Sequence, residues 1–195
     1  MSLSAAWEAA LDQLAASPKP FNKTCVRSVA AEWGAPDDVI SGEGTRMSGW
    51  RLAPVGVRAV YASLDEETAT REVTGRKKRM SGNAIISDDA YPRMTYRIAF
   101  DIERCVDLRE VDPASVLAEV VAGVLDENDL RVSQDVGEYL TSKGIQGAIF
   151  PSVTGSGANV VAFLDAKPAP RVDIANRKKV EAGIEKFIQR YRKRP

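Results

Sequence analysis

The sequence of 195 residues contains no histidine and only two cysteines. The missing histidine excludes Ser-His-Asp and Cys-His catalysis and every metal site with a histidine ligand. Cys25 and Cys105 are far apart and form no CxxC or other ligand spacing, so we expect no zinc site and interpret both as small buried hydrophobic residues. Any chemistry must therefore use carboxylates, Arg, Lys, Tyr, Ser or Thr.

The chain also lacks an excess of charge of either sign and a long apolar run. Lysines and arginines number 27, as do aspartates and glutamates, so no overall field attracts nucleic acid. No stretch of about 18 apolar residues occurs, and no basic segment followed by an apolar one opens the sequence. We expect a cytoplasmic protein without direct contacts to nucleic acid or membrane.

What is present is typical of one globular unit, with 44% hydrophobic and 28% charged residues. The predicted strands are 24–29, 57–62, 94–102, 106–108, 148–150 and 160–164, and the predicted helices are 2–16, a segment opened by Ser63, 113–125, 133–142 and 180–191. Strands and helices mix without regular βαβ alternation, which predicts an α+β fold. We divide the chain into an N-terminal helix and linker (1–20), a central domain (21–170) and a basic C-terminal helix (171–195) that packs on or extends it.

Several polar residues on these elements have ordinary structural explanations when each is taken alone. Ser63 would open a capping box as the N-cap of a helix, and Ser152 follows a proline in a turn. Glu72 would be a solvated carboxylate, Arg51 a surface arginine and Tyr61 a core residue. Taken singly, none of them predicts a function.

Taken together, these residues resemble two signatures of the RES-domain family. The stretch GWRLAPVGVRAVYASLDEETATREV has an arginine in a Gly/Pro loop, a strand ending in tyrosine and serine, and a helix with a glutamate, at Arg51, Tyr61, Ser63 and Glu72. The stretch GIQGAIFPSVTGSGANVVAF runs from a strand through Pro-Ser and a glycine-rich loop to an asparagine, at Ser152 and Asn159. Arg27 matches the arginine that usually opens the domain.

The resemblance implies an ADP-ribosyltransferase-like mixed core with flanking helices, and a bacterial toxin that degrades NAD+. Cleavage of the nicotinamide–ribose bond develops positive charge on the ribose, which a fixed carboxylate stabilises. Arginines bind phosphates through forked donors, and a tyrosine presents an aromatic face. We predict three catalytic residues, Glu72, Arg51 and Tyr61, and four substrate-binding residues, Arg27, Ser63, Ser152 and Asn159.

The resemblance leaves the acceptor of the ADP-ribosyl group open. Inorganic phosphate as co-substrate would make the protein an NAD+ phosphorylase, water a glycohydrolase, and a protein side chain an ADP-ribosyltransferase. We favour phosphate or water, with phosphate ahead, because two arginines leave room for an additional anion. No cofactor or metal is expected beyond NAD+ itself as the substrate.

The resemblance also implies a partner, a cognate antitoxin with an Xre-like helix-turn-helix domain. The basic run at 76–79 and the basic C-terminal helix would both attract an acidic partner, although each is also explained as a solvated face. The alternative function is a non-enzymatic binding module that uses the C-terminal helix.

Overall fold

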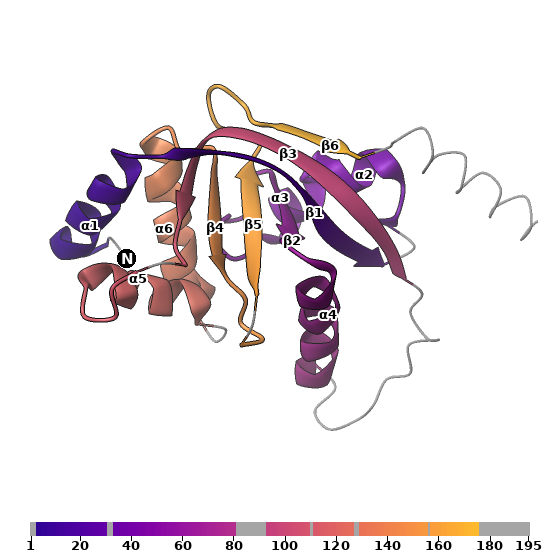
Figure 1. The fold of residues 1–195 in the computed structure, drawn as a ribbon, viewed down its shortest axis with the longest axis horizontal. Coiled ribbons are helices and arrows are strands. Elements are labelled where there is room, and N and C mark those ends of the chain that lie inside the picture. Colours follow the sequence, from indigo (N-terminus) through magenta and orange to yellow (C-terminus); the bar gives the residue numbers. More distant parts are fainter. Residues whose placement is uncertain are drawn as a thin grey trace, which may run out of the picture.

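The computed structural model describes residues 3–30, 33–80, 93–109, 111–126, 129–155 and 157–175, with residues 74–80 given by their backbone alone. Within these ranges the chain has the predicted α+β fold, in which helices flank a mixed sheet (Figure 1). The helices are α1 (Ala5–Ala15), α2 (Pro36–Ser41), α3 (Glu43–Ser48), α4 (Glu66–Met80), α5 (Val116–Leu125) and α6 (Leu130–Ser142). The strands are β1 (Lys19–Ala30), β2 (Ala59–Ser63), β3 (Arg93–Asp107), β4 (Gly147–Pro151), β5 (Ala158–Phe163) and β6 (Arg171–Ile174).

The described strands follow the order β1-β2-β5-β4-β3-β6, and β1 also pairs with β3. That second pairing is long and antiparallel, and it forms the arch at the top of Figure 1. Since β1 has both β2 and β3 as neighbours, the strands β1, β2, β5, β4 and β3 close into a ring. The ring brings β2, β4 and β5 together, although they are far apart in the sequence.

Two apolar clusters lie on opposite faces of the strands. Along β5, Val161 and Phe163 belong to the cluster that also holds residues of α1, α5 and α6. Val160 and Ala162 belong to the other cluster, with residues of β1, β3 and α2. This alternation is the two-residue period of a strand. Asn159 is two residues before Val161 and therefore lies on the face toward α5 and α6.

Elements on both sides of the predicted central domain, 21–170, pack on it. Helix α1 buries Leu11 and Ala15 in the first apolar cluster, so it belongs to the same core. The sheet continues past residue 170, because β6 pairs antiparallel with β3. The predicted helix over 180–191 lies outside the described residues.

The local prediction for Ser63 is wrong, because this residue ends β2 and does not open the following helix. The helix α4 begins at Glu66 and is capped by Asp65, whose carboxylate accepts hydrogen bonds from the backbone N of Thr68 at 2.7 Å and from its hydroxyl at 2.8 Å. The helix continues past Gly75 and ends at Met80.

The remaining elements differ from the predictions mainly in length. The predicted strands 94–102 and 106–108 are one strand, β3, which spans 15 residues. It pairs with β1 along most of its length and with β4 at its end. The local sequence pattern does not indicate pairing with β1 or β4. The sequence analysis therefore predicts two short strands where the structure has one.

Both cysteines are free and buried, as predicted. Burial raises the pKa of the Cys25 thiol to about 11 and that of Cys105 to about 12, so neither forms a reactive thiolate at neutral pH. None of the helices in the described ranges has the length and apolar character that a membrane span requires. In the same ranges, no three His, Cys, Asp or Glu side chains gather as metal ligands.

Candidate active site

The candidate site is built around the carboxylate of Glu72, which lies in the second turn of α4. Its Oε1 accepts a hydrogen bond from Ser152 Oγ at 2.6 Å and another from Asn159 Nδ2 at 2.8 Å. Ser152 directly follows β4, and Asn159 lies on β5. The fold therefore joins three of the sequence-predicted residues from separate segments.

Ser63 completes this group from β2. It pairs with Asn159 in the register of β2 and β5, and its hydroxyl donates to Asn159 Oδ1 at 2.8 Å. Both side chains are buried. Ser63 is thus brought to the site as expected, but its hydroxyl is engaged by another side chain of the protein.

The loop between β4 and β5 lies against α4 through one close approach. Gly157 has φ +79°, and a Cβ there would lie 1.8 Å from Thr68 Oγ1. Thr68 is one helical turn before Glu72, on the same face of α4. The carbonyl of Gly157 accepts the backbone N–H of Ser152 at 3.1 Å. Only glycine therefore allows the loop to hold Ser152 beside Glu72.

A second group surrounds Tyr61, two residues before Ser63 and hence on the same face of β2. Nη1 of Arg27 donates to the carbonyl oxygen of Tyr61 at 2.6 Å. Burial raises the pKa of the Tyr61 phenol, and the charges of Arg27 and Arg51 oppose this shift without cancelling it. The phenol is therefore neutral, with two cations close by.

Arg27 is a partly desolvated cation. Burial lowers the pKa of its guanidinium to about 10, so it stays charged at neutral pH. Its Nε is buried and has no hydrogen-bond partner within the described part of the chain. A buried donor without a partner is costly, and such costs are concentrated at functional sites.

Arg51 is buried, which corrects the interpretation of a surface arginine in a loop. Its Nη1 donates to the carbonyl oxygens of Val124 and Asp126, the latter at 3.2 Å, at the C-terminal end of α5. A cation there also faces the negative end of the helix dipole. The next residue, Leu52, has φ +63°, which is uncommon outside glycine. Arg51 thus supports the turn beside Tyr61.

The sequence did not indicate Thr154, which also belongs to the site. Its hydroxyl is 2.8 Å from Ser152 Oγ, and its backbone N donates to the same oxygen at 3.2 Å. The residue lies in the glycine-rich loop of the second signature, where composition indicates a turn but no particular contact.

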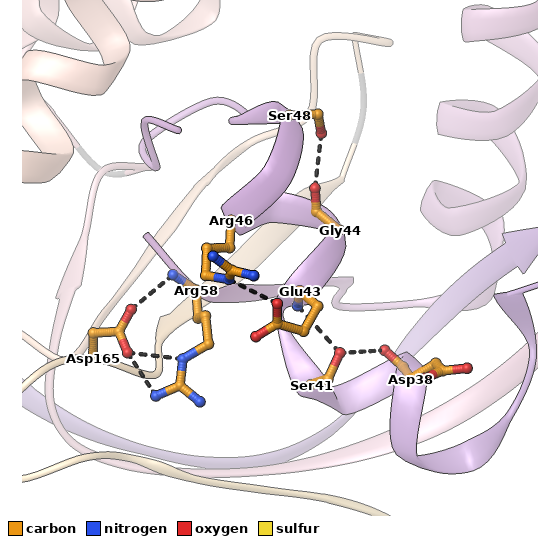
Figure 2. Close-up of polar contacts among 8 residues, drawn as sticks. All are labelled: Asp38, Ser41, Glu43, Gly44, Arg46, Ser48, Arg58 and Asp165. Atoms are coloured by element: carbon orange, nitrogen blue, oxygen red, sulfur yellow. Dashed lines mark hydrogen bonds and ion pairs between the residues drawn. The ribbon is translucent and has the colours of Figure 1, made fainter. Parts of the chain in front are cut away.

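A separate group of charges lies at the other end of β2 (Figure 2). Arg58 donates to Asp165 Oδ1 from Nε at 2.9 Å and from Nη2 at 2.7 Å. Arg46 donates to Glu43 at 2.7 Å within α3. The Arg58–Asp165 pair joins the residue before β2 to a residue after β5, and both exposed pairs lie outside the candidate site.

Comparisons with known proteins agree with the signatures. A family model described as the RES domain matches residues 24–183. A search of curated proteins gives no match. Among solved structures, a chain in the crystal structure of the M. tuberculosis MbcT–MbcA toxin–antitoxin complex is similar, with a TM-score of 0.70 and 19% identity over 89% of this chain and 91% of that chain. Because the family model covers most of the sequence, the chain belongs to the RES domain family.

Proposed function

We propose that this protein is the toxin of a toxin–antitoxin pair and that it cleaves the nicotinamide–ribose bond of NAD+. The observation that carries the proposal is the Glu72 carboxylate, held by Ser152 and Asn159 on a single oxygen. Among the described residues, its other oxygen, Oε2, accepts no hydrogen bond. A carboxylate anchored on one oxygen can present the other to a substrate.

Loss of nicotinamide leaves positive charge shared between C1 and the ring oxygen of the ribose. A negative charge already fixed beside that position stabilises the transition state without reorganisation. Glu72 is half-buried, so bulk water screens its charge less than that of a surface carboxylate. A carboxylate can also assist cleavage by accepting a hydrogen bond from a ribose hydroxyl, which orients the sugar.

The group around Tyr61 would hold the remainder of the dinucleotide. Arg27 keeps its charge at neutral pH and offers forked donors to a phosphate oxygen. The ring of Tyr61 would pack on the nicotinamide or the ribose. Arg51 would add positive charge and hold Tyr61 in place, because its own carbonyl accepts the Tyr61 hydroxyl.

The acceptor in this proposal is phosphate or water. Phosphate would form a bond to C1 of the ribose as nicotinamide leaves, giving an ADP-ribose phosphate, and water would give ADP-ribose. Incubation of the full chain with NAD+, with and without inorganic phosphate, distinguishes the two by their products. Nicotinamide release in either condition supports the proposal, and intact NAD+ in both contradicts it.

A cytoplasmic enzyme that consumes NAD+ harms its own cell unless a partner restrains it. The similar M. tuberculosis chain comes from a toxin–antitoxin complex, which supports a cognate antitoxin for this chain. We propose that this antitoxin has a helix-turn-helix domain and makes any DNA contact. Expression of the chain with and without the neighbouring gene should arrest growth only without it, after cellular NAD+ has fallen. Arrest while NAD+ stays constant would contradict this function.

A further inference from the structure

Two chains of hydrogen bonds converge on Oε1 of Glu72, one from Ser63 and one from Thr154. We propose that Ser63 and Thr154 are positioning residues, which act through Asn159 and Ser152 to turn Oε2 of Glu72 toward the substrate. This inference rests on the proposed function, because it assigns the orientation of the same carboxylate.

The first chain has a fixed direction. An ionised carboxylate can only accept hydrogen bonds, so Asn159 must present its NH2 group to Glu72. Its carbonyl oxygen then faces Ser63, whose hydroxyl must donate, and the two atoms are 2.8 Å apart. Without the Ser63 hydroxyl, the amide keeps its hydrogen bond to the carboxylate but loses the donor that holds its carbonyl oxygen in place.

The second chain is fixed in the same way. Ser152 has one hydroxyl hydrogen, which it donates to Glu72 Oε1 at 2.6 Å. The contact of 2.8 Å between the hydroxyls of Ser152 and Thr154 therefore needs Thr154 as the donor. The backbone N of Thr154 donates to the same Ser152 oxygen at 3.2 Å. Because the hydroxyl and the backbone N–H of Thr154 both donate to Ser152 Oγ, the Ser152 hydroxyl hydrogen has one favourable direction, toward Glu72.

Both chains end on the same oxygen, and they reach it from different strands. Asn159 lies on β5, and Ser152 follows β4, so the carboxylate is fixed from two sides on Oε1 alone. Rotation about the last side-chain bond of Glu72 would break both hydrogen bonds at once. If the Glu72 carboxylate acts on the substrate through Oε2, this restraint raises the rate, because a misplaced catalytic atom slows the reaction.

Thr154 allows a matched test, because valine has nearly the shape of threonine without the hydroxyl. Thr154→Val should lower kcat for nicotinamide release roughly tenfold, which corresponds to the loss of about one hydrogen bond's worth of transition-state stabilisation. KM, NAD+ affinity and thermal stability should stay near wild type, because Thr154 lies outside the core and acts, in this proposal, only through Ser152. Thr154→Ser, which restores the hydroxyl, should recover most of the lost rate.

Ser63, which begins the other chain of hydrogen bonds, is tested in the same way, by removal and restoration of its hydroxyl. Ser63→Ala should lower kcat by a similar factor, and Ser63→Thr should recover part of the rate. Thr141→Val serves as the control, because it removes a hydroxyl that bonds only to backbone carbonyls within α6.

The two proposals fail in different ways. An active wild type whose rate is unchanged in both Thr154→Val and Ser63→Ala contradicts the positioning role alone. Equal loss in Thr154→Val and Thr154→Ser also contradicts it, because the hydroxyl would then not matter. A wild type that releases no nicotinamide contradicts the proposed function, and the positioning role with it.

Discussion

The hydroxyl of Tyr61 donates a hydrogen bond to the backbone carbonyl of Arg51, ten residues earlier in the chain. The guanidinium of Arg51 in turn holds the end of α5. The carbonyl of Tyr61 accepts from Arg27 on β1. Tyr61 is therefore fixed at its hydroxyl and at its backbone, and its half-buried side chain packs against the first apolar cluster.

Arg51→Ala should lower the free energy of unfolding by about 3 kcal/mol, because the substitution leaves buried carbonyls of α5 without a donor. Urea unfolding followed by circular dichroism measures the change. If Arg51 served only to bind phosphate, the variant would keep its stability and lose only NAD+ affinity, which would contradict the structural role.

Tyr61→Phe should keep most of the activity, because the hydroxyl points to Arg51 and the ring is retained. The lost hydrogen bond should cost about 1 kcal/mol of stability. Tyr61→Leu, which removes the aromatic face, should raise KM for NAD+ markedly. Inactivity of Tyr61→Phe in a folded protein would mean that the phenol takes part in the reaction directly.

Because of Arg27, the affinity for NAD+ should depend on pH in the alkaline range. Because burial lowers the pKa of the folded Arg27 to about 10, NAD+ affinity should fall as the pH rises through about 10. Arg27→Met should bind weakly at every pH and show no such fall. Isothermal titration of both proteins between pH 7 and about 10.5 tests this.

The sign of the linked stability change distinguishes this loss from unfolding. Folding disfavours the charged form of Arg27, so above pH 10 the unfolded chain holds more protons at this group than the folded one. Its contribution to stability therefore rises with pH in that range. Circular dichroism at the same pH values should show a folded protein, and equal pH dependence of affinity in wild type and Arg27→Met would contradict the assignment.

Gly157→Ala should reduce nicotinamide release at least tenfold, because a Cβ 1.8 Å from Thr68 Oγ1 would push Ser152 away from Glu72. Gly155→Ala is the matched control. Gly155 also has a positive φ, +88°, but no atom lies within 4 Å of a Cβ there. Equally reduced rates in the two alanine variants would show that backbone strain, and not the contact with Thr68, causes the loss. Wild-type rates in both would show that neither matters.

The sequence predicted the fold class and most elements because their local patterns are strong. It failed at Ser63, because Asp65 offers a competing cap and the pairing of Ser63 with Asn159 is a contact between distant strands. It could not find β6, whose four residues are stabilised by pairing with β3. Local propensity carries no information on such partners.

The candidate site was predicted in part for the same reason. The two signatures supplied Glu72, Ser152 and Asn159, and the fold brings them within hydrogen-bonding distance. The burial of Arg51 depends on the end of α5, and the contribution of Thr154 depends on the rotation of one serine hydroxyl. Neither follows from the order of residues along the chain.

The role of Glu72 is the central claim, and one pair of variants on the same helix tests it. Glu72→Gln keeps the size of the side chain and removes its charge. Glu67→Gln makes the same change at an exposed residue whose partner is Arg71. Nicotinamide release from NAD+ should be lost, by at least a hundredfold, in Glu72→Gln and retained in Glu67→Gln, with NAD+ affinity near wild type in both. Turnover by folded Glu72→Gln at the wild-type rate would contradict the account.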